Sequence, residues 1–404
     1  MKKTVRILLC VVMFGIILCA NAAPPVPGFI HAAAGKKFVP KVAETLKVKL
    51  AVVGDIMCHD EQLNNFYDKS SDSYDFTPQF SSIKPYLADA DYTIGNLEFV
   101  LGGKAMGYSG YPMFNGPDAY AKAIKDAGVD FLSTANNHCN DRREKGLLQT
   151  LQTLDELGFD HAGTYASQQD RDSVFVNEIN GVKFAFLSYT YGTNGIAVPA
   201  GKEYQVNLIS EELLKSDIAA ARALNPDFVV VIPHMGNEYE TAPKQVFKNW
   251  VSLMLDAGAD IILASHPHVL QPAEFRTIQN PDGTERRCFV IYSLGNFVSA
   301  QRTIPRDSGV VLNLYIEKQP GEKAEIKLAS LIPTWVRFNN LAEKRAITVL
   351  PLSDQLIRLR DGETLDIMGK DIARLSASFA EFSKMYFKGR LSQDDLRREY
   401  VLEM

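Results

Sequence analysis

The clearest indication of the fold is the stretch Asp-Ala-Gly-Ala-Asp-Ile-Ile-Leu-Ala-Ser-His-Pro-His, residues 256–268. It predicts a helix stopped by Gly258, a short buried strand over 261–264, and a loop that presents His266 and His268. Residues 126–138, Asp-Ala-Gly-Val-Asp-Phe-Leu-Ser-Thr-Ala-Asn-Asn-His, repeat this pattern. In both copies the last histidine follows the second aspartate by eight residues. The echo predicts two similar halves, each a strand with its helix, that face one shared site.

Further apolar runs also end in side chains that can bind metals. They place Asp55 after residues 48–53, Glu98 after 92–95, and His234 after 228–232. Such runs predict an α/β fold, in which parallel strands gather the polar side chains at one edge of the sheet. Four of the seven histidines lie at these strand ends. The pattern indicates a metal site, and two ions are expected there.

The His266-Pro-His268 pair gives the strongest single indication of a metal. Residues i and i+2 of an extended strand project to the same side, and Pro267 restricts its predecessor to extended geometry. Both imidazoles are therefore expected to address one metal cluster. Glu238 is expected to orient His234 from the second coordination sphere.

The segment Asn136-Asn137-His138 is open to two interpretations. An amide oxygen can bind a divalent ion without adding charge, and the histidine beside it can act as a general acid or phosphate contact. The alternative is an Asn turn next to a hydrogen-bonded core histidine. A mixture of imidazole, carboxylate and amide ligands favours Mn, Fe or Zn over Mg or Ca.

The N-terminal residues and the composition restrict where the protein is located and which partners it has. Residues 1–22 predict a signal peptide, because Lys2, Lys3 and Arg6 precede an apolar stretch that ends in Ala20-Asn21-Ala22. The mature protein is then expected outside the cytoplasm, in the periplasm or at the cell surface; an uncleaved membrane anchor is the alternative. With 43 Lys and Arg against 48 Asp and Glu and no basic stripe, nucleic acid is not an expected partner.

The domain organisation follows from the same patterns. Residues 23–46 predict a linker, 47–350 the α/β domain, and 351–404 a C-terminal helical extension that ends in a helical stretch over 393–404. Residues 64–82 predict a long loop. The cysteines Cys58, Cys139 and Cys288 remain after signal removal; Cys58 and Cys139 are expected to be buried free thiols, and a disulfide between them is the alternative. Further helices are expected at 117–127, 145–157, 210–224 and 243–256, and strands at 183–188, 288–292, 310–317 and 324–331.

Six motifs in order resemble those of a known family. They are Gly54-Asp55-Ile-Met, Gly95-Asn-Leu-Glu98, Asn136-Asn-His138, His234-Met-Gly-Asn-Glu-Tyr239, Ser265-His-Pro-His268 and Ser293-Leu-Gly-Asn-Phe297. These motifs resemble the poly-gamma-glutamate capsule biosynthesis proteins of the CapA type, within the broader calcineurin-like metallophosphatase superfamily. The resemblance covers about residues 47–340.

The resemblance implies a four-layer α/β/β/α sandwich with a two-metal site and His138 as the acid or substrate contact. The implied ligands are Asp55, Glu98 as the bridging carboxylate, Asn137, His234, His266 and His268. The residues Asn96, Asn136, Glu238 and Asn296 are expected to support these ligands or the substrate. Metallophosphatases usually place a ligand histidine two residues after the first aspartate, and this chain has Met57 there.

Three functions are compatible with these observations. The leading expectation is an exported protein that supports synthesis or export of an anionic capsular polymer together with a membrane-bound synthesis complex. The second is an envelope phosphoesterase that hydrolyses a phosphate ester. The third is a binding subunit with a structural metal site. The local basic residues Lys104, Arg142, Arg143 and Arg302 are candidates to offset the negative net charge near a polyanion.

Overall fold

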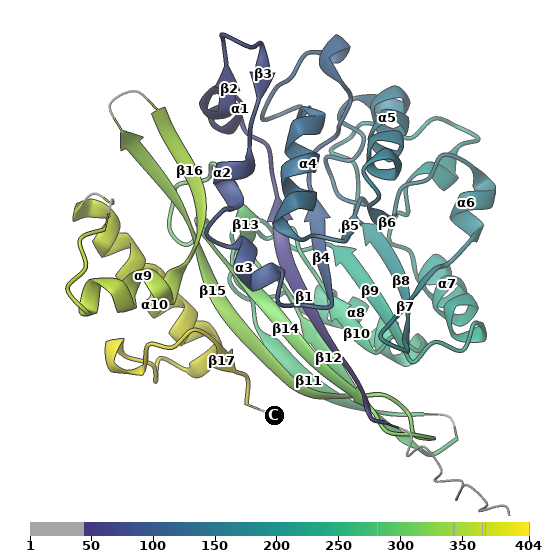
Figure 1. The fold of residues 1–404 in the computed structure, drawn as a ribbon. Helices are drawn as coiled ribbons and strands as arrows, with labels where there is room; N and C mark the ends of the chain where they lie inside the picture. Colours follow the sequence, from purple (N-terminus) through teal and green to yellow (C-terminus); the bar gives the residue numbers. More distant parts are fainter. Residues whose placement is uncertain (1–43, 281, 342–343, 366, 368, 404) are drawn as a thin grey trace, which may run out of the picture. The chain divides into compact units, whose positions relative to one another are not determined.

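Two β-sheets packed face to face form the centre of the fold (Figure 1). The structure is a computed structural model and describes residues 44–404 except 281, 342–343, 366, 368 and 404. The expected signal peptide and nearly all of the expected linker therefore lie outside the described residues. Residues Glu44–Met404 form one compact unit.

The first sheet combines a parallel half with an antiparallel half. Strands β1, β4, β5 and β6 run parallel, whereas β14, β15 and β16 extend the sheet antiparallel from the other side of β1. Two short strands join it, β13 beside β1 and β17 beside β15. In sheet order the bounds are β16 (Lys344–Pro351), β15 (Glu325–Leu341), β14 (Ser308–Lys318), β1 (Leu46–Ile56), β4 (Tyr92–Leu97), β5 (Phe131–Ser133) and β6 (Asp160–Ala162), with β13 (Asn296–Val298) and β17 (Tyr400–Val401).

The second sheet has a parallel centre with an antiparallel strand at each edge. Its order is β11 (Ala273–Gln279), β12 (Glu285–Ile291), β10 (Ile261–Leu263), β9 (Phe228–His234), β8 (Val182–Thr190) and β7 (Phe175–Ile179). The parallel strands are buried on both faces, which explains their continuous apolar runs in the sequence.

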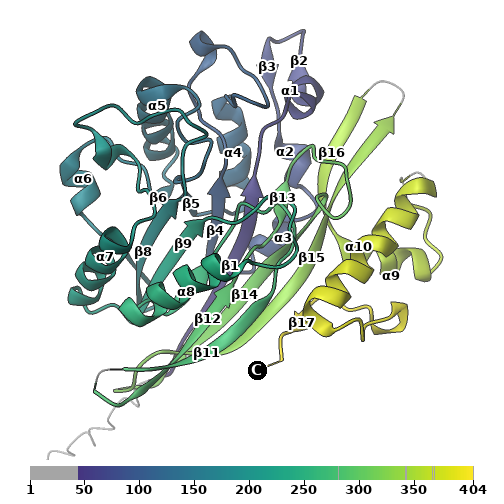
Figure 2. The same ribbon diagram turned by 180° about the vertical axis from the view of Figure 1, so that it is seen from behind.

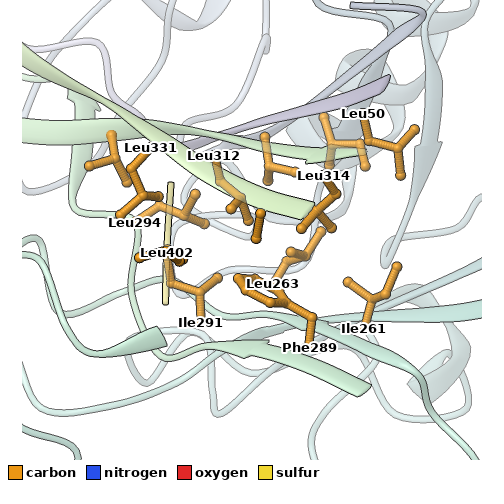
Figure 3. Packing of buried hydrophobic residues seen from close by; sticks show 14 of the residues in the cluster. Leu50, Ile261, Leu263, Phe289, Ile291, Leu294, Leu312, Leu314, Leu331 and Leu402 are labelled. Atoms are coloured by element: carbon orange, nitrogen blue, oxygen red, sulfur yellow. The ribbon is translucent and has the colours of Figure 1, made fainter. Parts of the chain in front are cut away.

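Alternating side chains divide the core into layers. On β1, Leu50 and Val52 point into the core between the sheets, whereas Ala51 and Val53 point to the outer face. Figure 3 shows residues of both sheets meeting in the inner core, among them Leu50 and Leu312 from the first sheet and Leu263 and Phe289 from the second. Each sheet therefore contributes one face to this central core.

Helices cover the two outer faces. On the first sheet lie α1 (Asp60–Phe66), α2 (Thr77–Phe80), α3 (Lys84–Leu87), α4 (Asp118–Ala127) and α5 (Arg143–Glu156); on the second lie α7 (Glu211–Ala223) and α8 (Gln245–Ala257), which Figure 2 shows from behind. The remaining short elements are β2 (Tyr67–Asp68), β3 (Ser73–Tyr74), α6 (Gln168–Asp172) and the 3-10 turns η1 (Lys104–Met106), η2 (Glu203–Gln205) and η3 (Gln393–Asp395). The expected α/β/β/α sandwich is confirmed.

The sequence echo is confirmed in space, with one copy in each sheet. Helix α4 ends at Gly128 and leads into β5, and helix α8 ends at Gly258 and leads into β10; both glycines have positive φ. The aspartates before the strands play the same part. A backbone N–H of the neighbouring strand donates to Asp130 from Thr93 at 2.9 Å and to Asp260 from Val229 at 2.7 Å. Each aspartate thus ties the start of its strand to the adjacent one.

The C-terminal region differs in part from the expectation. Helices α9 (Leu352–Arg360) and α10 (Gly369–Phe387) pack on β15 beside the two sheets (Figure 1). The expected helix over 393–404 is wrong, because β17 lies there and pairs with β15. Tyr400 and Leu402 are buried in the central core cluster, so burial of these two side chains and the open backbone groups of β15 favour a strand.

Residues 64–82 are also more ordered than the predicted long loop. They contain the end of α1, the β2–β3 hairpin and α2. Phe76 and Phe80 are buried against Tyr120, so aromatic packing holds this polar segment in place. Among the described residues, Cys58, Cys139 and Cys288 are free and buried, as expected. No helix of the described part of the chain is both long enough and apolar enough to cross a membrane.

Candidate metal centre

The structure brings the six predicted metal ligands together where the parallel strands of both sheets end. Asp55, Glu98 and Asn137 come from the first sheet, at or just beyond the ends of β1, β4 and β5. The three histidines come from the second sheet: His234 is the last residue of β9, and His266 and His268 follow β10. All six side chains are buried.

Residues of both sheets donate hydrogen bonds to the carboxylate of Asp55. Its carboxylate accepts hydrogen bonds from Asn96 Nδ2 at 2.8 Å and from the His266 backbone N–H at 3.3 Å, and it lies 3.2 Å from His268 Nδ1. Burial alone would raise the pKa of Asp55, but the hydrogen bond and charge of His268 hold that pKa well below its usual value. Asp55 is therefore a carboxylate that stays ionised.

Gly54 lies within a strand and not in a turn. Strand β1 continues to Ile56, and a Cβ at Gly54 would lie 2.0 Å from the carbonyl oxygen of Gly295. Glycine is required here because another backbone passes against the strand, and the Asp55 N–H donates to this same carbonyl at 3.1 Å. The close approach fixes Asp55 at the edge of the sheet.

Glu98 lies at the middle of the centre. Its Oε1 atom is 3.6 Å from His234 Nε2 and 3.6 Å from His268 Nε2. The side chain is fully buried, and neither carboxylate oxygen has a hydrogen-bond partner in the structure. Burial, and then the negative charge of Asp55, raise the pKa of Glu98 well above its usual value. A buried carboxylate without donors is what a bound cation would satisfy.

Two groups of ligand atoms share Glu98. One consists of Asp55, Glu98 and His268, and the other of Glu98, His234 and His266; within each group the ligand atoms lie within 4.8 Å of one another. A carboxylate common to two such groups has the position of a bridging ligand between paired ions. Buried imidazole and carboxylate donors, together with the bare oxygens of Glu98 and the unpartnered Nδ1 of His266, fit divalent transition metals.

Asn137 and Ser265 hold the imidazole of His234. Asn137 Oδ1 is 2.8 Å from His234 Nε2, and Ser265 Oγ is 3.0 Å from His234 Nδ1. The structure thus differs from the expectation that Glu238 orients His234. Glu238 is exposed and instead forms a third group of possible ligands with His266 and His268. Burial lowers the pKa of His234 to about 3, so its imidazole is neutral and able to bind a metal.

The His-Pro-His segment is not extended, contrary to the sequence prediction. His266 has φ 105° and His268 has φ 57°, in the region that side chains other than glycine rarely adopt. The two rings nevertheless converge, with centroids 5.9 Å apart. Backbone bonding selects this conformation, since the His266 N–H donates to Asp55 and the Ser265 N–H to Pro233. Strain of this kind is typical of functional sites.

His138 lies beside this centre with its own carboxylate partner. Its Nδ1 is 2.8 Å from Asp141 Oδ2, and its ring meets that of Phe114 edge to face at 4.6 Å. His138 and Asp141 are both buried. The pair fixes the orientation of the imidazole and leaves Nε2 for other contacts. The sequence analysis missed Asp141, although its spacing of three residues from His138 was a usable sign.

Three asparagines support the ligands. Asn96 donates to Asp55, and Asn136 Nδ2 donates to the Leu97 carbonyl at 2.7 Å, next to Glu98. Asn296 Oδ1 lies 3.0 Å from His268 Nδ1 and fixes that ring. These contacts are the outer-sphere bonds that orient metal ligands.

Met57 belongs to the core and not to the centre. Its side chain is packed in the outer cluster of the first sheet, and its carbonyl accepts hydrogen bonds from Gln62 and Tyr120. His59 begins helix α1, and its Nδ1 accepts from the Ala300 N–H at 3.2 Å. His59 is therefore outside the groups of ligand atoms, and Met57 is a core residue.

The fold and centre define a class of protein: a four-layer α/β/β/α sandwich with a candidate metal centre built from both of its sheets. The family is shown by sequence comparison. Residues 49–301 match the family described as bacterial capsule synthesis protein PGA_cap, and the chain belongs to this family. The resemblance drawn from the six motifs is thereby confirmed.

Two relatives are capsule proteins of Bacillus. The chain is 33% identical over 282 residues to "Capsule biosynthesis protein CapA" of Bacillus anthracis, a match that covers 67% of this chain and 64% of that protein. It is 30% identical over 362 residues to "PGA biosynthesis protein CapA" of Bacillus subtilis strain 168, covering 84% and 88%. The chain thus spans slightly less than two thirds of the Bacillus anthracis protein.

Solved structures with distant similarity include two proteins with hydrolase names. The NAD nucleotidase NadN of Haemophilus influenzae has 13% identity and a TM-score of 0.42, and the match covers 85% of this chain and 61% of that one. The calcineurin-like phosphoesterase YfkN of Bacillus subtilis has 14% identity and a TM-score of 0.39, covering 86% and 100%.

Proposed function

We propose that this protein is exported and supports the synthesis or export of an anionic capsular polymer, poly-gamma-glutamate, through a centre that binds two divalent ions. Mn, Fe or Zn suits the ligands. The observation that supports this proposal most strongly is the position of Glu98. Glu98 is a buried carboxylate without hydrogen-bond donors and is common to two groups of ligand atoms. The names of both Bacillus relatives support the capsule role.

The candidate ligands form two sets, one for each ion. Asp55, Glu98 and His268 would hold one ion, and Glu98, His234, His266 and Asn137 the other. Bound ions would supply positive charge that attracts and polarises an oxyanion, whether a carboxylate or a phosphate. Burial lowers the pKa values of His234 and His266, so these two ligands would bind as neutral imidazoles. The charges of Glu98 and Asp55 outweigh burial and raise the pKa of His268 to about 9, so His268 would release a proton when a cation binds.

The protein is proposed to act with a membrane-bound synthesis complex outside the cytoplasm. The expected signal peptide and the capsule names of the relatives support this location. A polymer-handling role requires affinity for the growing anionic chain and does not require turnover of a phosphate ester.

A phosphoesterase is the second candidate, and the His138–Asp141 pair favours it. Asp141 would accept a hydrogen bond from the Nδ1–H of His138, so that the imidazolium form of His138 could deliver its Nε2 proton to a leaving oxygen. A structural metal site has no need of such a pair. A binding subunit with a purely structural site is therefore the weakest of the three readings.

One experiment separates these readings. Metal content is measured by elemental analysis on the purified wild type and on the double variant His266→Ala/His268→Ala, with turnover of a model phosphodiester and binding of poly-gamma-glutamate assayed on the same samples. The matched control is His161→Ala, because His161 lies on β6 and pairs with Asp155 outside the groups of ligand atoms.

The proposal expects about two ions per chain and polymer binding in the wild type and in the control, with both lost in the double variant. Metal-dependent turnover that Asp141→Asn reduces would establish the phosphoesterase. A wild type that takes up no metal after reconstitution with Mn or Zn would overturn the centre itself.

A further inference from the structure

An arginine lies stacked on a tyrosine beside the candidate centre. The guanidinium carbon of Arg306 is 3.3 Å from the ring centroid of Tyr239, and the Tyr239 ring centroid is 6.2 Å from that of His268. Stacking uses the flat face of the guanidinium and leaves its in-plane N–H groups directed outward. The pair thus presents hydrogen-bond donors next to a metal ligand.

Backbone bonds tie both members of this pair to the centre. The Arg306 carbonyl accepts from Asn296 Nδ2 at 2.8 Å, and Asn296 also contacts His268. The Tyr239 N–H donates to the Pro267 carbonyl at 2.8 Å, between the two ligand histidines. Tyr239 has φ 67°, which is unusual for a tyrosine. The pair therefore has a fixed position relative to the candidate ligands.

The same pair lies where the buried centre meets solvent. Tyr239 is 38% exposed, and Tyr191, whose ring centroid is 4.7 Å from that of His266, is 48% exposed. Exposed tyrosines in contact with buried ligand histidines mark the side from which a substrate can arrive. Glu238 is the exposed acid at this place, and its membership in a ligand group with both histidines means that a cation there would neutralise it.

Arg306 has no carboxylate within ion-pair distance in the described part of the chain. Three of the four basic residues expected from the sequence are committed elsewhere: Lys104 pairs with Asp72, Arg142 donates to Ser109, and Arg302 donates to the Val336 carbonyl. Arg306 is therefore a cationic group at the entrance with free donors.

We propose that Arg306 is a specificity residue that binds a second anionic group of the substrate, while the metal centre binds the first. The substrate class is then a molecule with at least two neighbouring oxyanions, as in a polyacid chain or a molecule with linked phosphates. Planar guanidinium donors match carboxylate and phosphate oxygens. This inference rests on the proposed function, because the first anion is assigned to the ions.

The pairing of Arg306 with a second anionic group is tested by changing the protein and the ligand in turn. The protein is loaded with Mn²⁺, and calorimetry measures binding of a γ-linked glutamate trimer and of the same trimer with amides in place of every carboxylate but one. Wild type is compared with Arg306→Gln, and with Tyr239→Phe, which keeps the stacking ring. The matched control is Arg287→Gln, an arginine stacked on Phe275 at 4.0 Å near the start of β12, at the opposite end of the strands. A parallel cycle uses pyrophosphate and orthophosphate, so that the two sources of oxyanion are distinguished.

Arg306→Gln should lower the affinity for the probe that has the second anion by about tenfold or more. It should lower the affinity for the other probe by less than about twofold. Tyr239→Phe and Arg287→Gln should leave both affinities close to wild type. Equal effects on both probes, or no effect, would overturn the role of Arg306. Metal content is measured on the same samples, so a wild type without bound Mn²⁺ would instead overturn the proposed function.

Discussion

Replacing Glu98 with glutamine should stabilise the metal-free protein and abolish its response to metal. Glu98 is fully buried, both of its oxygens lack donors, and its pKa is raised by burial. Without an ion, the folded protein therefore bears a carboxyl group that water would solvate better. Glutamine has nearly the same shape without the charge, and its amide would lie beside the imidazole nitrogens of His234 and His268.

The magnitude follows from the cost of an unsatisfied buried group, about 1–3 kcal/mol. We expect the free energy of unfolding of metal-free Glu98→Gln to exceed that of metal-free wild type by this amount at neutral pH. This corresponds to a rise in Tm of about 1–4 °C for a unit of this length. Because a raised carboxyl pKa destabilises only above the unfolded value of 4.5, the difference should shrink as the pH falls toward that value. Metal at a hundred times its Kd should add about 2.7 kcal/mol to wild type alone, which offsets most or all of this difference.

Thermal unfolding with chelator and with added Mn²⁺ or Zn²⁺ measures both effects. Glu285→Gln is the control, because Glu285 is exposed on β12, and it should change stability by less than about 0.5 kcal/mol. A metal-free Glu98→Gln protein that is less stable than wild type, or one that metal stabilises as strongly as wild type, would refute the reasoning.

Three other substitutions have defined outcomes. Asn296→Ala should lower metal affinity about tenfold or more in a metal titration, because it removes the oxygen that holds His268 Nδ1. His59→Asn should flatten the pH dependence of the unfolding free energy measured with denaturant: burial lowers the pKa of His59 to about 4, so wild type loses stability as the pH falls from 6.5 toward 4. Arg374→Met should destabilise the fold by about 3–5 kcal/mol in the same assay, because it leaves the buried carboxylate of Asp307 without its guanidinium.

Controls for these three variants come from the same chain. Asn280→Ala removes a half-buried asparagine that bonds to Thr284, and it should leave metal affinity unchanged. His161→Asn should leave the steep pH dependence of wild type between 6.5 and 4 in place. Arg358→Met breaks an exposed pair with Glu363 and should cost less than about 1 kcal/mol. Equal effects of a variant and its control would contradict the corresponding prediction.

Much of the fold could be predicted because local signals and burial agree there. The runs ending near Asp55, Glu98 and His234 are strands buried on both faces, and the glycines of the echo are helix stops. The long β15–β16 hairpin and the pairing of β17 were not predicted. Their pairing depends on contacts between distant residues, such as Leu331 with Tyr400, which a local pattern does not contain.

The candidate metal centre could also be predicted only in part. The side chains that the structure brings together could be named from the sequence, because each follows a recognisable strand. Their bonding partners could not: the backbone at His266 and His268 is set by tertiary hydrogen bonds, and Ser265, not Glu238, holds His234. Arg306 was also missed, since its position depends on Asn296 and on a ring from another loop.

Each sheet supplies three of the six candidate ligands, so each of the two proposed ions would be bound from both sheets and would hold the sheets together. Any sliding of one sheet over the other would change the distances among Asp55, Glu98 and the three histidines. By thermodynamic reciprocity, whatever tightens the packing of the core between the sheets, which contains Leu50 and Leu263, would then raise metal affinity by the same factor with which metal strengthens that packing. Core substitutions far from the ligands would in this way tune how readily the protein releases its metal.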